Sequence, residues 1–511
     1  MLCRRYTFGF DTYRRCNVLP LNGNCSSIAY VSSNAWHVSD FSTGTLVTVQ
    51  NSFSGIGCIA LSKNSLYIAV GYCGDNPNIV IYTLPDLTPF KTLSGGTSNR
   101  FSSLTFSQSD KYIASVGSSP DYTLTVWDWE SECIMLRSKA FSQDVFNIAF
   151  SPLNDRHLVT SGIVHIKFWS MAKTFTGLKL DGKLGRFGAV ELSDIYGFVQ
   201  FPDGKVLCGS ESGNLFLWEG ALIKAVIKPN SSSNCHEGNV ESLCLIYGED
   251  STPSVVVSAG QDGFIKAWDF DLIDQAYPEF GLEVFVTPLT SLEISNQRIH
   301  SLELLDKALL VTDTSGAVHK VLLQNNLPFD YETLFVCYSG PIIGGSWLNS
   351  SHVLCYGFDG KLIIFDCRDY CKPTTILSEQ FHGNGSCLYS FAEHFSIPHL
   401  ALIGTTNGIV RLVGASLGGF ILFSALRPCK AAITDICVNH FDVSSTLSDV
   451  YVVTVSKDGV LWKYSLDIPN NVLTPVCMVS FSTFSINITE PPKLAAIKNG
   501  FLVTVGADFF N

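Results

Sequence analysis

Short apolar stretches of about five residues, separated by polar turns, recur along the whole chain. The fullest example is VVVSAGQDGFIKAWDF, Val255–Phe270, in which two apolar stretches flank an Asp-Gly dipeptide. Asp-Gly readily adopts the positive φ of a tight hairpin turn, so this segment predicts a β-hairpin. Apolar residues at the helical spacing of three and four do not form a convincing stretch over a dozen positions. The pattern therefore predicts a nearly all-β fold.

The hairpin pattern is repeated at Val206–Glu219, Val353–Asp366 and Val452–Ser465, and weaker copies lie between these segments. A degenerate copy lies upstream at Ser27–Val49, with its third strand expected near His37–Phe41. Aligned on Trp268, the other copies follow one another at roughly 42 to 53 residues, close to the period of about 40–45 in WD repeats. The aligned anchor positions are Tyr82, Trp127, Trp169, Trp218, Trp268, Val321, Phe365, Val413 and Tyr464. This spacing predicts four-stranded blades of WD-repeat β-propellers.

Counting these copies predicts two domains. Ten copies are more than the roughly four to eight blades that close a propeller, and seven is a common number. We therefore predict a first seven-bladed propeller over residues 1–328 and an incomplete second propeller over residues 329–511. The polar segment Gln324–Thr333 is the predicted linker, and Lys493–Asp508 repeats the first two strands of a further blade. Because an unfinished propeller leaves an unpaired edge, we expect a truncated gene model, a fragment or a split polypeptide.

Composition narrows the classes of partner. The formal net charge is −12, with 15% charged and 46% hydrophobic residues, which argues against nucleic acid as the main ligand. No apolar run reaches the ~20 residues of a membrane span, and Met1–Phe10 lacks the apolar core of a secretory signal. We therefore expect no membrane association and a chain that stays on the cytoplasmic side.

Four arginines near the N-terminus are a local exception to the acidic charge, and they alternate with aromatic residues. One interpretation is an arm that contacts an acidic surface such as tubulin. The preferred one is a strand over Tyr6–Phe10 that closes the propeller, with solvated arginines at its ends. These arginines are Arg4, Arg5, Arg14 and Arg15.

The sequence contains no phosphate-binding loop, nucleophile elbow or H-E-x-x-H motif. A superficial triad with an aromatic neighbour is offered by His236, Ser258, Asp262 and Trp268. In a blade, the same four side chains can satisfy one another's hydrogen bonds and fix the register of the hairpins, which is the reading we favour. We therefore predict no enzymatic activity, no catalytic residue and no cofactor.

Seventeen cysteines, an odd number, lie mostly within strand patterns and predict buried reduced thiols. The nearest approach to a metal constellation is Cys355, Cys367 and Cys371 with His352. It lacks the paired C-x-x-C spacing of zinc sites, so we predict no metal site.

Two segments are candidate partner surfaces. The insert Thr174–Ser193 carries Lys179, Lys183 and Arg186, and its alternative interpretation is a solvated basic loop. Tyr277 and Phe280 are the second candidate, with an ordinary contact between blades as the alternative.

The stretch Leu180–Ile227 departs from a generic repeat. Its motifs GRFG, ELSDIYGFV and PDGKVLCGSESGNLFLWEGALIK, followed by Asn234-Cys235-His236 and Ala259–Asp274, closely resemble the cilia- and flagella-associated protein 44 family of large WD-repeat proteins. The likeness is strongest over about residues 100–275. The segment IAYVSSNAWHVSDFSTGTLVTV also resembles the first blade of the echinoderm microtubule-associated-protein-like group.

The resemblance implies a non-enzymatic scaffold in the axoneme of a cilium or flagellum, a cytoplasmic and cytoskeletal location. Family members, with a related WD-repeat partner, tether the motor domains of inner-arm dynein heavy chains to the doublet microtubule, so the implied partners are proteins, including dynein and tubulin. Members also carry a coiled-coil tail, for which this sequence has no heptad segment. A generic WD-repeat adaptor remains the alternative. A propeller enzyme would need polar or charged side chains converging on the central channel.

Overall fold

The computed structural model divides the chain into two compact units, Met1–Cys337 and Tyr338–Asn511. The described residues are 10, 12, 14–15, 17–21, 27–32, 34–40, 43, 45–50, 55–175, 177–336, 342–368, 374–390, 399–438, 450–467, 469–480, 493–497 and 500–504.

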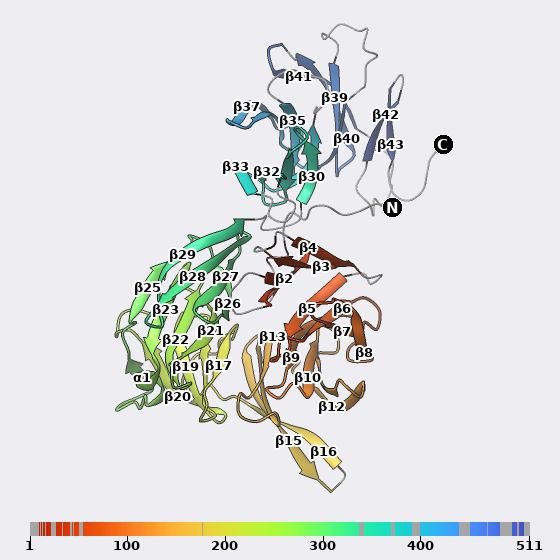
Figure 1. The fold of residues 1–511 in the computed structure, drawn as a ribbon. Coiled ribbons are helices and arrows are strands. Elements are labelled where there is room, and N and C mark those ends of the chain that lie inside the picture. Colours follow the sequence, from red (N-terminus) through yellow and green to blue (C-terminus); the bar gives the residue numbers. More distant parts are fainter. Residues whose placement is uncertain are drawn as a thin grey trace. The chain divides into compact units, whose positions relative to one another are not determined.

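Within the described part of the first unit, the strands form seven sheets, each built on four antiparallel strands, and the fifth sheet gains a fifth strand, β24 (Figure 1). In chain order the first four sheets are β1–β4 (Val18–Pro20, Ser27–Ser32, Ala35–Asp40, Thr45–Gln50), β5–β8 (Gly55–Leu61, Tyr67–Cys73, Ile79–Thr83, Pro89–Leu93), β9–β12 (Phe101–Phe106, Tyr112–Gly117, Thr123–Asp128, Cys133–Lys139) and β13–β16 (Val145–Phe150, His157–Gly162, His165–Thr174, Gly177–Leu184). The last three sheets are β17–β20 (Phe198–Gln200, Val206–Gly209, Leu215–Glu219, Leu222–Lys228), β21–β23 with β25 (Val240–Tyr247, Pro253–Gly260, Phe264–Asp269, Thr290–Glu293) and β26–β29 (Ile299–Leu304, Ala308–Asp313, Ala317–Gln324, Leu327–Val336).

The seven sheets close into a ring. Buried apolar side chains form one cluster at each contact between consecutive sheets, as where Trp36 of the first sheet meets Tyr82 of the second. The cluster that closes the ring joins Val18 and Ile28 of the first sheet to Leu310 and Val318 of the seventh. First strands of consecutive sheets contact one another, for example β5 with β9 and β21 with β26, so these strands line the ring axis. The predicted fold class, an all-β WD-repeat propeller with seven blades, is confirmed.

The sixth sheet has an excursion between its third and fourth strands. It begins with the short helix α1, Phe270–Asp274, whose N-cap Asp269 accepts a hydrogen bond from the Leu272 amide. The chain then adds β24, Glu283–Phe285, in parallel to the outer strand β20 of the fifth sheet. The excursion therefore ties two neighbouring blades together.

In the described part of the second unit, three four-stranded sheets are followed by a hairpin. Buried clusters again join consecutive sheets, and β42 contacts the first strand of the third sheet. The strands are β30–β33 (Ile342–Trp347, His352–Gly357, Lys361–Asp366, Thr374–Gln380), β34–β37 (Gly385–Ser390, His399–Thr405, Val410–Ser416, Gly419–Leu426), β38–β41 (Ile433–Val438, Val450–Ser456, Val460–Asp467, Val472–Ser480) and β42–β43 (Lys493–Ile497, Gly500–Thr504).

The predicted linker Gln324–Thr333 was wrong, because it forms the turn and outer strand of the hairpin β28–β29. Asn325 and Asn326 both have positive φ, 51° and 62°, which is the conformation of a two-residue hairpin turn. Pro328 follows in the outermost strand, where a missing amide donor is tolerated. A polar Asn-Asn-Leu-Pro sequence therefore made a turn here and not a domain boundary.

Candidate functional site

The four side chains His236, Ser258, Asp262 and Trp268 form one hydrogen-bonded chain. The Trp268 indole Nε1–H donates to Ser258 Oγ at 2.9 Å, and Ser258 Oγ lies 2.7 Å from His236 Nε2. On the other side of the His236 imidazole, Nδ1 lies 2.9 Å from Asp262 Oδ1. The carboxylate can only accept, so Nδ1–H donates to it, and Nε2 accepts from the serine hydroxyl.

This arrangement has the connectivity of a catalytic triad but no route for a substrate. Ser258 and His236 are both buried, and the Ser258 oxygen already accepts from the indole. Burial lowers the pKa of His236, which keeps the imidazole neutral, and the hydrogen bond with Asp262 opposes that effect. The geometry suits a network that fixes hairpin register.

Gly263 completes the turn between β22 and β23 with a φ of 77°, and a Cβ at this position would lie 1.7 Å from the Ser295 carbonyl oxygen.

Four tryptophans hold the same position in the third strand of consecutive blades. In each case the indole Nε1–H reaches diagonally across to the second strand, to Ser115 from Trp127, Thr160 from Trp169, Cys208 from Trp218 and Ser258 from Trp268. Tyr82 instead pairs its hydroxyl with that of Tyr72 at 2.8 Å. The third strands also carry Val321, Phe365, Val413 and Tyr464, all buried.

A charged cluster lies where first strands of four blades meet. Glu241 is on β21, and its carboxylate is fully buried between two guanidiniums. Glu241 Oε2 lies 2.5 Å from Arg15 Nη2, and Glu241 Oε1 lies 2.5 Å from Arg298 Nη2. Arg15 also lies over the ring of Tyr196 at 4.6 Å. The Tyr196 ring in turn stacks on Phe146 of β13 at 4.9 Å. We call these five residues the axial cluster, because they come from strands or adjoining loops that line the ring axis.

The axial cluster corrects the interpretation of the N-terminal arginines. Arg15 is neither a free arm nor solvated, since its side chain is 17% exposed and bonded to Glu241. Phe10 is buried and lies outside any strand, whereas Arg4, Arg5 and Tyr6–Gly9 lie outside the described residues. Charged groups do therefore converge on the axis, but they are paired with each other, and an arginine does not act as a proton donor or acceptor near neutral pH.

Three members of the axial cluster were not predicted from the sequence, namely Glu241, Arg298 and Tyr196. A signal existed, because Glu241 is the one charged residue in the strand VESLCLIY. A buried carboxylate in such a strand requires a cationic partner.

The predicted basic surface lies on and after a long hairpin. β15 and β16 project beyond the neighbouring strands, as Figure 1 shows at the lower edge of the first unit. Lys179 and Lys183 are exposed on one face of β16, and Asp181 lies between them on the same face. Arg186 is exposed beyond the strand, where its amide donates to the Ala221 carbonyl. Phe175, near the tip, is fully exposed.

Tyr277 and Phe280, in the excursion of the sixth sheet, are 79% and 92% exposed. A buried contact between blades is therefore not their role. Other residues of this excursion are buried, among them Ile273 and Ala276, which pack in the cluster between the fifth and sixth sheets.

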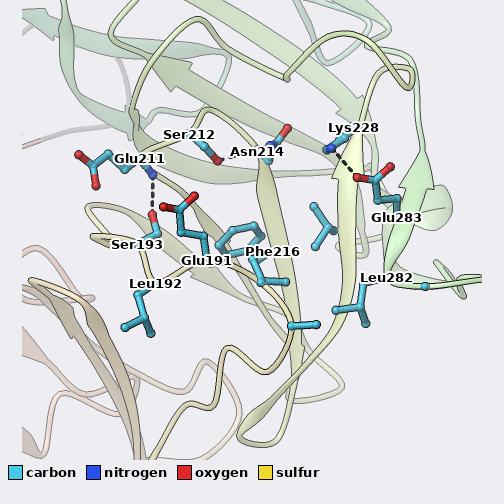
Figure 2. Close-up of a pocket in the computed structure, with 14 residues that line it drawn as sticks. Glu191, Leu192, Ser193, Glu211, Ser212, Asn214, Phe216, Lys228, Leu282 and Glu283 are labelled. Carbon is cyan, nitrogen blue, oxygen red and sulfur yellow. Dashed lines mark hydrogen bonds and ion pairs between the residues drawn. The ribbon is translucent and has the colours of Figure 1, made fainter.

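A cleft of about 570 Å³ lies beside this excursion (Figure 2). Its walls come from the loop Ala189–Ser193, the β18–β19 turn, β20 and Gly281–Glu283. Figure 2 shows Glu191 and Glu211 on one side and the Lys228–Glu283 ion pair, 2.5 Å long, on the opposite side. Phe216 and Leu282 contribute apolar surface.

The cysteine constellation contains buried thiols. Burial raises the pKa of Cys355 to about 12 and that of Cys367 to about 11, and Cys371 lies outside the described residues. His352 Nδ1 lies 2.8 Å from Asn349 Oδ1. Within the described ranges, no group of three His, Cys, Asp or Glu side chains is placed to hold a metal ion. In the same part of the chain, no helix is long and apolar enough to cross a membrane.

Comparison with known proteins agrees with this architecture. Residues 54–308 match the family model of the echinoderm microtubule-associated protein first beta-propeller. Over 426 residues, 81% of this chain, the sequence is 37% identical to mouse cilia- and flagella-associated protein 44. The chain is a relative of cilia- and flagella-associated protein 44. The same protein of Chlamydomonas reinhardtii is 43% identical over 46% of the chain and 14% of its own length.

The resemblance inferred from the sequence motifs is thus confirmed. A more distant match is mouse echinoderm microtubule-associated protein-like 4, 26% identical over 42% of the chain and 23% of its own length. The chain spans only about a fifth of mouse cilia- and flagella-associated protein 44, since the match covers 22% of that protein.

Proposed function

We propose that this protein is a non-enzymatic scaffold of the ciliary or flagellar axoneme, which tethers or regulates inner-arm dynein motor domains relative to the doublet microtubule. The observation that supports this proposal most is the 37% identity to mouse cilia- and flagella-associated protein 44 over 81% of the chain. The first unit makes up 337 of 511 residues, so a match of that length includes part of the second.

The construction of the first unit suits a mechanical role. Seven apolar interfaces close the ring, the tryptophan anchors tie second and third strands together, and the axial cluster joins first strands to the N-terminal residues. A tether must transmit force without changing shape, and close-packed interiors have low compressibility. The proposed partners are a related WD-repeat subunit, dynein heavy chains and tubulin.

We further propose that the projecting hairpin supplies part of the partner surface, through Lys179, Lys183 and Arg186. These cations are exposed on a chain with a net charge of −12, so they favour an acidic partner. Phe175 near the tip adds an apolar anchor of the kind enriched at interfaces.

The test is fractionation of a ciliated cell that expresses the tagged protein from its own locus. We expect it in detergent-extracted axonemes, released by salt together with inner-arm dynein, and we expect irregular beating after its removal. A charge-reversed hairpin, Lys179→Glu with Lys183→Glu, should lower the axonemal fraction, whereas the exposed-site control Lys307→Glu should not. Recovery from the cytosol of non-ciliated cells, with none in axonemes, would instead indicate a general WD-repeat adaptor.

A further inference from the structure

Two insertions distinguish the first unit from a ring of plain blades, and both expose aromatic side chains. One is the projecting hairpin β15–β16 of the fourth blade, where Phe175 is fully exposed near the tip. The other is the excursion of the sixth sheet, where Phe285 is 56% exposed in addition to Tyr277 and Phe280. Exposed apolar surface among polar groups marks interaction sites. Each insertion therefore presents a surface that a partner would cover.

The hairpin is long enough to enter the surface of another molecule (Figure 1). The pairing of β14 with β15 reaches only to Ser170, whereas β16 continues beside β15 as far as Thr174. The strand β15 therefore extends past β14 by the four residues Met171–Thr174, which span ~13 Å at about 3.3 Å per residue. Phe175 follows directly after this projecting part.

The two insertions carry opposite charges. Over residues 173–186, the hairpin has four cations and one carboxylate. Over residues 270–289, the excursion has four carboxylates and no cation. Charged surfaces of opposite sign steer two partners together and fix how they dock. The hairpin and the excursion are therefore complementary in charge as well as in their exposed aromatic rings.

Part of this charge is free to meet a partner. Asp274 and Glu283 are each paired with a lysine of the fifth blade, at 2.8 Å and 2.5 Å. Asp271 and Glu279 are exposed, and neither forms an ion pair among the described residues. Across the same described ranges, the cations of the hairpin have no carboxylate partner either. Both surfaces thus present charges without a counterion from their own copy.

The two surfaces do not satisfy each other within one copy. Phe175 is fully exposed and Phe280 is 92% exposed, so neither ring covers the other in the folded chain. One molecule therefore carries both halves of a complementary pair, and these halves can meet only between two molecules.

We propose that the projecting hairpin of one copy docks on the sixth-sheet excursion of a second copy of this chain. Phe175 packs against the rings of Tyr277 and Phe280, and the hairpin lysines lie against the two unpaired carboxylates. Because the two surfaces differ, the contact is heterologous, so it can repeat from copy to copy or close into a ring. This inference rests on the proposed role of the hairpin as a partner surface, and it names a second copy as the acidic partner.

Sedimentation velocity of the full 511-residue chain tests the contact. One hairpin on one excursion is smaller than a standard interface of about 1,600 Å², so we expect weak association and follow it up to about 100 µM protein. The weight-average mass should rise with protein concentration. It should fall as salt is added, because salt screens the paired charges.

Two charge-reversed variants identify the surfaces. Lys179→Glu with Lys183→Glu reverses the hairpin, and Asp271→Lys with Glu279→Lys reverses the excursion. Either variant alone should associate at least ten-fold more weakly than the original chain. An equimolar mixture of the two should regain association, because the reversed hairpin of one variant meets the reversed excursion of the other, and their original surfaces also meet.

Matched controls lie elsewhere on the first unit. Lys307→Glu and Glu130→Lys each reverse one exposed charge, and they should change association less than two-fold. Phe280→Ser should weaken association at least five-fold, since aromatic anchors carry much of the energy of an interface. Leu153→Ser changes a residue that is 72% exposed outside both insertions, and it should have no effect.

Three results would overturn the proposal. They are a monomer at about 100 µM, unchanged association of reversed variants that melt like the original chain, and a mixture that associates no better than either variant alone. A monomeric chain whose axonemal recovery still depends on the hairpin lysines would overturn the second copy as occupant and leave the proposed function in place. Self-association of a chain that is absent from axonemes would support the contact and overturn the proposed function.

Discussion

Replacing Glu241 by glutamine should destabilise the first unit more than any change of a single arginine around it. Glu241 is completely buried, and each of its oxygens lies 2.5 Å from a guanidinium nitrogen. Breaking a buried ion pair by removing one partner costs about 3–5 kcal/mol, because the other charge is left without a counterion. In Glu241→Gln, two arginines lose their counterion together, so we expect a cost at the upper end of this range.

The single arginine variants should cost less, and in a defined order. Arg298 is 32% exposed and Arg15 is 17% exposed, so water compensates Arg298 better. Arg15→Met also loses a hydrogen bond to the Glu241 carbonyl and the contact with Tyr196. The expected order of destabilisation is Glu241→Gln, then Arg15→Met, then Arg298→Met, with Glu241 keeping one guanidinium in each arginine variant.

Native-state hydrogen exchange of the full chain measures these costs locally. A loss of about 5 kcal/mol is a large part of the 5–15 kcal/mol stability of a typical domain, so amides of β13, β21 and β26 should exchange much faster in Glu241→Gln. The exposed-site variant Glu130→Gln is the control. A double-mutant cycle of Arg15→Met with Glu241→Gln should give a coupling of about 1–3 kcal/mol. Unchanged exchange in Glu241→Gln, or zero coupling, would refute the axial cluster as a source of stability.

Three further predictions concern the first unit. Trp268→Phe removes the 2.9 Å indole bond to Ser258 and should cost about 1–2 kcal/mol in thermal unfolding, and a cost no larger than that of an exposed-site substitution would count against the network. Burial and two neighbouring guanidiniums lower the pKa of His300 to about 3, so its contribution to stability is full above about pH 6.5 and is lost as pH falls toward 3. His300→Gln should therefore flatten the fall of melting temperature between pH 6.5 and 4, and an unchanged slope would contradict this assignment. Phe175→Ser should leave the melting temperature unchanged, because the ring is fully exposed, but should lower axonemal recovery. Normal recovery would exclude the tip from the partner surface.

Local features of the chain could be derived from sequence because they depend on neighbouring residues. An alternation with a period of two, an Asp-Gly turn and a repeat near 45 residues specify a hairpin and its register, and β22–β23 has Val256 opposite Trp268 as that pattern requires. The hydrogen-bonded chain from Trp268 to Asp262 also lies within one repeat and its preceding loop. The same local logic misplaced the linker, since Asn325-Asn326 serves equally in a hairpin turn.

Only the tertiary structure decided which distant segments meet. Arg15 contacts Glu241 across 226 positions, and β24 leaves its own blade to pair with β20. No periodic pattern encodes such contacts, because they depend on closure of the ring and on the paths of two insertions. Closure brings first strands to one axis, where a buried carboxylate needs cations from whichever segments reach it. The propeller can therefore be predicted from the sequence, whereas the axial cluster and the cleft form only once the ring of blades has closed.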